Sequence, residues 1–102
     1  AARPHVSRAH NSIGMIYMLQ SEWITARDHY RLALQLATPD QRNQPRINLA
    51  HTEIELGEWR SAVRSYARAL EDATPRESFA CLMGLCNVCL EVELLDAARA
   101  LL

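Results

Sequence analysis

A segment of eight residues returns 36 positions later in this chain. Residues 23–30 read WITARDHY and residues 59–66 read WRSAVRSY, so tryptophan, alanine and tyrosine keep the same places in both segments. The alanine and the tyrosine follow the tryptophan by three and seven positions, which puts all three on one side of a helix. A helical pattern that recurs at a fixed interval of roughly 20–50 residues predicts an array of stacked helical units.

The interval of 36 residues also relates positions outside these two segments, and it predicts a third unit. A small residue recurs at Gly14, Ala50 and Cys86, where it permits close approach of paired helices. The pair Thr38–Pro39 matches Thr74–Pro75. Three further sets share the interval: Trp23, Trp59 and Leu95; Ala26, Ala62 and Ala98; Tyr30, Tyr66 and Leu102.

Each unit is predicted to contain two helices joined by a short turn, so that the chain forms three stacked helical hairpins. The breaks fall at residues 20–22 and 56–58, where Gly57 can adopt the positive φ that ends a helix. Leu102 falls in the middle of the expected second helix of the third unit. We therefore expect the third unit to be incomplete.

Two proline-containing segments mark where helices begin between the units. Residues 74–77 read TPRE, which has the form of a capping box with proline at the first helical position, and residues 38–41, TPDQ, repeat this form. Pro45 is unfavourable inside a helix that begins at Pro39. We therefore expect the first helix of the second unit to begin near Asn43, or to be kinked there.

This pattern resembles the tetratricopeptide repeat, a helix-turn-helix unit. The matching places in the first unit are His10, Ile13, Gly14, Tyr17, Ser21, Trp23, Ala26, Tyr30, Ala33 and Pro39. In the second unit they are Arg46, Leu49, Ala50, Glu53, Gly57, Trp59, Ala62, Tyr66, Ala69 and Pro75. The third unit matches more weakly, through Leu82, Leu85, Cys86, Cys89, Glu93, Leu95, Ala98 and Leu102. The departures are the polar His10 and Arg46, the replacement of tyrosine by Glu53 and Cys89, and an interval longer than the family's usual length of about 34 residues.

The resemblance implies an all-α fold, a right-handed superhelical array of helix-turn-helix hairpins with about three repeats. Residues 1–102 are expected to form a single repeat domain, with repeats over about 5–38, 41–74 and 77–102. Because the last repeat is incomplete and no polar capping helix follows it, we expect the chain to be a fragment of a longer array.

The resemblance also implies a function, because first helices of such arrays line a concave groove that receives a partner segment. We expect a non-enzymatic scaffold or adaptor that binds a protein or peptide. The alternative is a regulatory or self-association module of a larger enzyme, transcription regulator or secretion assembly, in which the open C-terminal end packs on a neighbour. The expected partner-binding residues are Asn11, Met15, Leu19, Ile47, Asn48, His51, Glu55, Met83 and Asn87.

A second candidate surface is the opposite, convex face. Arg60, Arg64 and Arg68 recur every four residues along one expected second helix, and Arg27 and Arg31 lie one unit earlier. Acidic residues close to these arginines favour a solvated charged face over an anion-binding site.

Composition excludes several function classes. The formal net charge is −1, from 11 basic and 12 acidic residues, so no global field attracts nucleic acid or an anionic membrane. All the basic residues are arginine, which excludes lysine-dependent chemistry within this segment. The longest mostly apolar run, residues 79–90, is shorter than the roughly 20 residues that span a bilayer. We expect a cytoplasmic protein without membrane insertion.

The cysteines and histidines do not predict a catalytic, cofactor or metal site. Cys81, Cys86 and Cys89 have the spacing of plant-type iron–sulfur ligands, but a fourth cysteine is missing and Cys86 occupies a small-residue position. We therefore expect the three cysteines to be packing residues. No two of the four histidines are four positions apart, so a zinc pair on one helix face is absent from the sequence.

Overall fold

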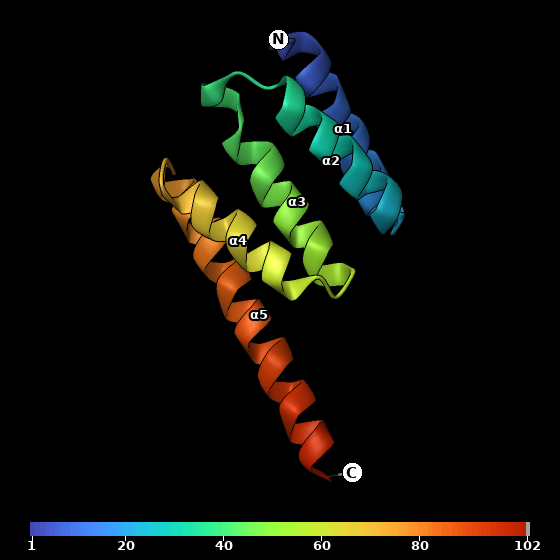
Figure 1. Cartoon of the computed structure of the whole chain (residues 1–102), viewed down its shortest axis with the longest axis vertical. Coiled ribbons are helices and arrows are strands. Elements are labelled where there is room, and N and C mark those ends of the chain that lie inside the picture. Colours follow the sequence, from blue (N-terminus) through green and yellow to red (C-terminus); the bar gives the residue numbers. More distant parts are fainter. Residues whose placement is uncertain (102) are drawn as a thin grey trace.

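Five α-helices and one 3-10 helix account for most of the chain, and the computed structural model describes residues 1–101. The helices follow one another as neighbouring hairpins (Figure 1). Their bounds are α1, Pro4–Leu19; α2, Trp23–Leu36; the 3-10 helix η1, Pro39–Gln41; α3, Asn43–Glu55; α4, Trp59–Leu70; and α5, Pro75–Leu101. The described part of the chain contains no strand, and the predicted all-α array of helical hairpins is confirmed.

The two predicted turns are present, and each contains a residue with positive φ. Ser21 has a φ of 59° between α1 and α2, and Gly57 has a φ of 76° between α3 and α4. The predicted helix starts are also confirmed, because α3 begins at Asn43 and α5 begins at Pro75. TPDQ at residues 38–41 starts only the short η1, since Pro45 cannot continue a helix from there.

The small and aromatic residues of the repeat form the core, as predicted. Ala26, Tyr30, Ala62 and Tyr66 are all fully buried. Two clusters divide the core between the hairpins. One contains Ala26, Tyr30 and Leu49; the other contains Ile47, Ala50, Ala62, Tyr66, Ala69, Cys81 and Val88.

The third unit differs from the expected hairpin. Its first helix continues without a break, so that α5 runs for 27 residues and extends beyond the rest of the molecule (Figure 1). Glu93 occupies the place of Ser21 and Gly57, and a glutamate gains nothing from the left-handed conformation that closes the other two turns. Ala98, the counterpart of Ala26 and Ala62, is exposed as a result. Leu102 lies outside the described residues.

The long α5 also changes the expectation for the cysteines and for membrane insertion. Cys81 is buried, but Cys86 and Cys89 are exposed because no second helix covers that side of α5. The expectation that all three are packing residues is therefore wrong for two of them. By length and composition alone α5 could also cross a membrane, with a mean hydropathy of 1.6 over 18 residues.

Candidate functional site

A hollow lies where α1 meets the beginning of α3, and we call it the α1–α3 hollow. Its volume is about 280 Å³. It is lined by Ser7, Arg8, Asn11, Gln41, Gln44 and Pro45. Ser7 donates its hydroxyl proton to the Ala33 carbonyl at 2.7 Å and is therefore already satisfied. The groups that remain for a ligand are side-chain amides and one guanidinium.

A chain of side-chain amides connects this hollow to the middle of α3. Asn48 is only 6% exposed, and its Nδ2 donates to Asn11 Oδ1 at 3.0 Å. Gln44 Nε2 donates to Asn48 Oδ1 at 3.2 Å. Because Asn48 holds both neighbours, the amide of Asn11 is fixed at the edge of the α1–α3 hollow. A neutral amide carries both donors and acceptors, which suits the backbone of an extended peptide.

The other predicted site residues lie in different environments. Met15, Leu19, Glu55, Met83 and Asn87 are exposed. Among the apolar members Leu19 is the most open, at 83% exposure. These side chains are accessible to a partner, but none of them belongs to the lining of the α1–α3 hollow.

Two residues of α3 that were predicted to contact a partner, Ile47 and His51, are not free to do so. Ile47 is only 3% exposed and belongs to the core cluster around Tyr66, so it supports α3 from behind and cannot contact a ligand. Its side chain is buried because α4 and α5 both pack against α3. His51 is half-buried, and its Nδ1 pairs with the hydroxyl of Tyr66. Burial lowers the pKa of His51, so the neutral imidazole is favoured there.

Of the residues that line the α1–α3 hollow, the sequence predicted only Asn11 as a partner contact and missed Ser7, Arg8, Gln41, Gln44 and Pro45. A signal for two of them was present. Arg8 precedes Asn11 by three positions and Gln44 precedes Asn48 by four, so each shares a helix face with an asparagine that was identified. Gln41 belongs to η1, which lies in the connection between two hairpins. Helical spacing does not predict where the residues of such a connection lie.

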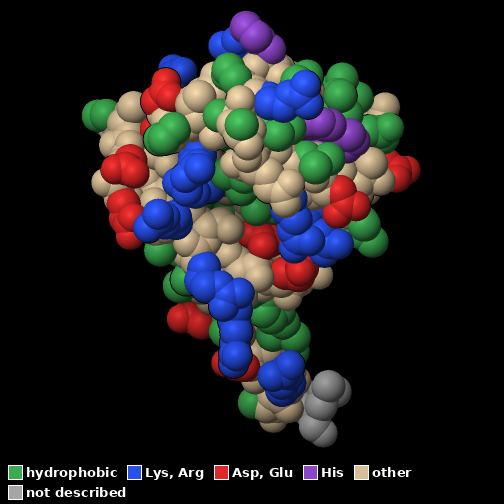
Figure 2. Space-filling view, turned by 45° about the horizontal axis from the view of Figure 1, so that its top comes forward, with side chains coloured by type: hydrophobic (Ala, Val, Ile, Leu, Met, Phe, Trp, Pro, Cys, Tyr) green, Lys and Arg blue, Asp and Glu red, His purple; other side chains and the backbone are tan. Residues whose placement is uncertain are grey.

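The opposite face contains a second depression, which we call the arginine hollow. It has a volume of about 360 Å³ and is lined by Leu34, Arg46, Arg64, Ser65 and Arg68. Burial, together with the charges of Arg68 and Arg42, lowers the pKa of Arg46. Figure 2 shows arginine side chains across the middle of the molecule with acidic side chains beside them. Of the arginines predicted on the convex face, Arg64 and Arg68 line this hollow. Arg27 and Arg68 form ion pairs with acidic residues.

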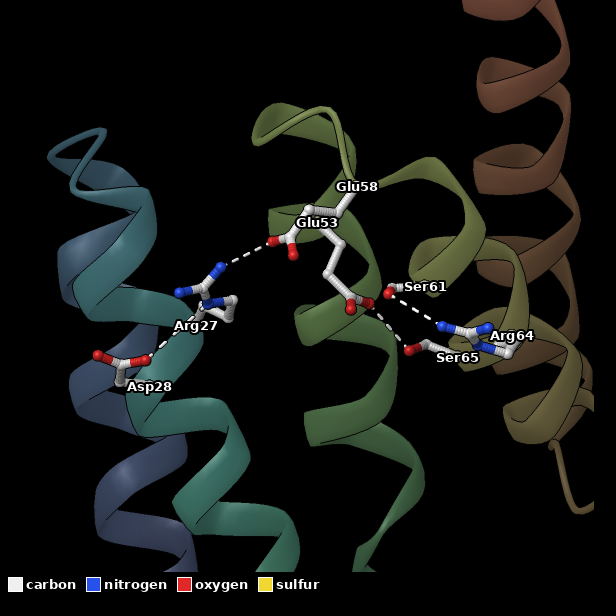
Figure 3. Close-up of polar contacts among 7 residues, drawn as sticks. All are labelled: Arg27, Asp28, Glu53, Glu58, Ser61, Arg64 and Ser65. Atoms are coloured by element: carbon white, nitrogen blue, oxygen red, sulfur yellow. Dashed lines mark hydrogen bonds and ion pairs between the residues drawn. The ribbon is translucent and has the colours of Figure 1, made fainter.

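Acidic partners pair with two of the arginines on this face, Arg27 and Arg68. Arg27 Nη1 lies 2.8 Å from Glu58 Oε1 and joins α2 to the residue before α4 (Figure 3). Arg68 lies 3.0 Å from Glu71. Glu53 is buried and accepts a hydrogen bond of 2.9 Å from Ser65 Oγ. Burial raises the pKa of Glu53, while the hydrogen bond from Ser65 acts in the opposite direction. Of these contacts, the Arg27–Glu58 pair joins neighbouring hairpins, the Glu53–Ser65 hydrogen bond joins α3 to α4 of one hairpin, and the Arg68–Glu71 pair is local to the end of α4.

No group of three or more histidine, cysteine or acidic side chains within residues 1–101 is placed to hold a metal ion. Burial raises the pKa of the Cys81 thiol, which disfavours the reactive thiolate.

Comparison with known proteins gives one match. The family model described as the tetratricopeptide repeat matches residues 5–74, which is more than half of the chain. The match ends at the residue before α5, the element that departs from the hairpin pattern. No curated protein and no solved structure matches the chain.

Proposed function

The chain belongs to the tetratricopeptide repeat family, and from that membership we propose that it is a non-enzymatic interaction module that binds an extended segment of a partner protein at the α1–α3 hollow. Members of this family generally mediate protein–protein interaction. The observation that carries the proposal is the hydrogen bond between Asn48 and Asn11, which holds two amides in order at the edge of this hollow.

The chemistry of the α1–α3 hollow fits a peptide backbone better than a charged small molecule. Asn11 and Gln44 offer both donors and acceptors, and an extended peptide presents N–H and carbonyl groups in alternation. Arg8 adds one cationic donor for a carbonyl or an acidic side chain. Further along α1, Met15 and Leu19 offer exposed apolar surface for the side chains of the same segment.

The test compares the α1–α3 hollow with the arginine hollow. Peptides selected from a random library by the wild-type chain serve as probes, and their affinities are measured for Asn48→Ala and Arg64→Ala at two salt concentrations. Removing a buried amide leaves its partners unpaired, so Asn48→Ala should weaken binding by about 10- to 100-fold, or roughly 1–3 kcal/mol. Arg64→Ala should cost no more than about 1 kcal/mol, because it removes an exposed charge that salt screens.

Gln44→Ala and circular dichroism complete the comparison. Gln44 is exposed, so its replacement should reduce peptide affinity without changing the helical content. If Arg64→Ala is the more damaging change and its effect shrinks at high salt, the arginine hollow is the binding site and the proposal for the α1–α3 hollow is wrong.

A further inference from the structure

The two opposite faces of α5 are both apolar, but only one is covered. Cys81, Gly84 and Val88 are buried against the preceding helices. The opposite face carries seven exposed apolar residues, which we call the α5 stripe: Phe79, Met83, Cys86, Leu90, Leu94, Ala97 and Leu101. Phe79 is 68% exposed, Leu94 68% and Leu101 88%. Apolar side chains are visible along the narrow end of the molecule, which is α5 (Figure 2).

The spacing of the α5 stripe is regular along the whole helix. Successive members are separated by 4, 3, 4, 4, 3 and 4 residues. From Met83 onward this is a 3-4-4 pattern that repeats after 11 residues, close to the period of about 3.6 residues of an α-helix. The stripe therefore drifts little around α5 over its length. A second straight helix could contact it from one end to the other.

The α5 stripe is also symmetric about Leu90. The intervals read 4, 3, 4 from either end toward the centre. Two antiparallel copies centred on Leu90 bring Cys86 of each copy to Leu94 of the other, and Met83 to Ala97. Each small residue thus meets a large one, which is the alternation that lets facing helices interdigitate. A surface that complements itself under a two-fold rotation is the requirement for a symmetric dimer.

We propose that α5 pairs antiparallel with α5 of a second copy of this chain, with the two-fold axis at Leu90. The contact extends from Phe79 to Leu101, a length of about 33 Å at 1.5 Å per residue. This inference does not depend on the α1–α3 hollow, because no member of the α5 stripe lines it.

Two other occupants fit the structure less well. A bilayer requires about 20 consecutive apolar residues, whereas the longest uncharged run of α5 is residues 78–90, between Glu77 and Glu91. In addition, Cys81 and Val88 are covered by protein. A fold-back of residues 94–101 onto the same α5 requires a turn at Glu93, and the helix is continuous there.

The first experiment measures mass by analytical ultracentrifugation across a concentration series. The chain has a mass of 11.6 kDa, and the dimer should have twice that mass. Leu90→Glu places two carboxylates at the axis and should raise the dimer Kd by about 100-fold or more. Leu90 is 57% exposed in the single chain, so this variant should keep its helical circular dichroism.

The matched control is Val92→Glu, which adds the same charge two residues away on the other side of α5. Val92 is also exposed, at 36%. This variant should dimerise like the wild type. The proposal is overturned if the wild-type chain stays monomeric across a 100-fold concentration series that reaches roughly 100 μM. It is also overturned if Leu90→Glu and Val92→Glu disrupt the dimer equally.

The second experiment tests the antiparallel register by disulfide formation. Leu94→Cys is prepared in a Cys89→Ala background, which leaves Cys86 and the buried Cys81. Antiparallel pairing should give covalent dimers in which mass spectrometry finds residue 86 of one copy joined to residue 94 of the other. Parallel pairing would join 86 to 86 and 94 to 94, and this result contradicts the proposal.

The last arm separates a second copy from a membrane. The wild-type chain is mixed with vesicles of phosphatidylcholine and phosphatidylserine and centrifuged through a density gradient. Dimers that stay at the bottom of the gradient support the proposal. Flotation of the chain with the vesicles, lost in Leu90→Glu, would assign the α5 stripe to a lipid surface and overturn the proposed dimer.

Discussion

Tyr66 of α4 contacts both α3 and α5. Its ring is fully buried, its hydroxyl pairs with His51 Nδ1, and Gly84 of α5 lies directly against it. Burial raises the pKa of Tyr66 well above its ordinary value, so the phenol stays protonated. Its counterpart Tyr30 is equally buried, with a pKa raised to about 12, and it packs against Gly14. The large aromatic of each second helix thus requires a small residue on a first helix.

We predict that Gly84→Ala destabilises the protein although it replaces glycine within a helix. Helix propensity alone would favour alanine by about 1 kcal/mol. A Cβ at Gly84, however, would overlap the ring of Tyr66, which cannot turn aside without losing its contact with His51. The overpacking should cost more than the propensity gains, for a net loss of roughly 1–2 kcal/mol in the free energy of unfolding.

Urea denaturation at one protein concentration measures this change. Asn87→Ala is the control, because Asn87 lies three residues further along α5 and is exposed. It should leave the free energy of unfolding unchanged or slightly higher. If Gly84→Ala proves as stable as this control, the Tyr66 ring can move at little cost and the close contact does not limit packing.

Among the elements, α5 has a start that a local sequence motif determines and an end that no such motif determines. Its start is local, because Thr74 Oγ1 accepts a hydrogen bond of 3.2 Å from the Glu77 amide and Glu77 Oε1 accepts one of 3.0 Å from the Thr74 amide. This reciprocal pair is the capping box that the sequence predicts. The continuation of α5 through Glu93 has no capping motif of this kind; its only local sign is that a glutamate replaces the Ser21 and Gly57 of the other two turns.

Thr74→Ala should therefore destabilise α5 at its start. Removing the hydroxyl leaves the Glu77 amide without its acceptor, and the loss of such a cap costs about 1 kcal/mol, with a range of roughly 0.5–2. Thr74→Ser keeps a hydroxyl in the same place and should restore most of the stability. Thermal unfolding followed at 222 nm, a wavelength that reports helix content, compares the two variants. Equal melting temperatures for alanine and serine would show that the cap contributes nothing.

For the whole molecule, burial is concentrated where α3 meets α4 and the first half of α5. The larger core cluster lies there, whereas residues 91–101 of α5 contain no buried residue. Stability in repeat proteins is a sum of contributions from each unit and its contacts with neighbouring units. The end of α5 has helical hydrogen bonds but few such contacts.

Hydrogen exchange should follow this gradient. In the Leu90→Glu variant, which removes the effect of dimerisation, we expect the slowest amide exchange in α3 and α4, and the fastest helical exchange in residues 91–101. Exchange followed by mass spectrometry of overlapping peptides resolves these segments. Equal protection of the two halves of α5 would mean that contacts absent from the single chain stabilise its end.

Much of this protein follows from local spacing. In the first two units the 36-residue interval is sufficient to predict the helices, both turns and the buried Ala26, Tyr30, Ala62 and Tyr66, because these two units bury the same face in the same way. Helical spacing also places Asn11 and Asn48 on first helices, but they are 37 positions apart, so only the folded structure shows the hydrogen bond that joins them.

Residue spacing could not predict which helix faces are covered, because this depends on how many neighbours each helix has. Ile47 is in register with the half-buried Asn11 and the exposed Met83, yet it is almost fully buried because α3 is covered on several sides at once. Cys86 shares its register with Gly14 and Ala50, yet it is exposed because α5 continues through Glu93 and no second helix returns to cover it. Burial is a property of the assembled stack, so the repeat pattern predicts a face of each helix but does not reveal whether that face finds a partner.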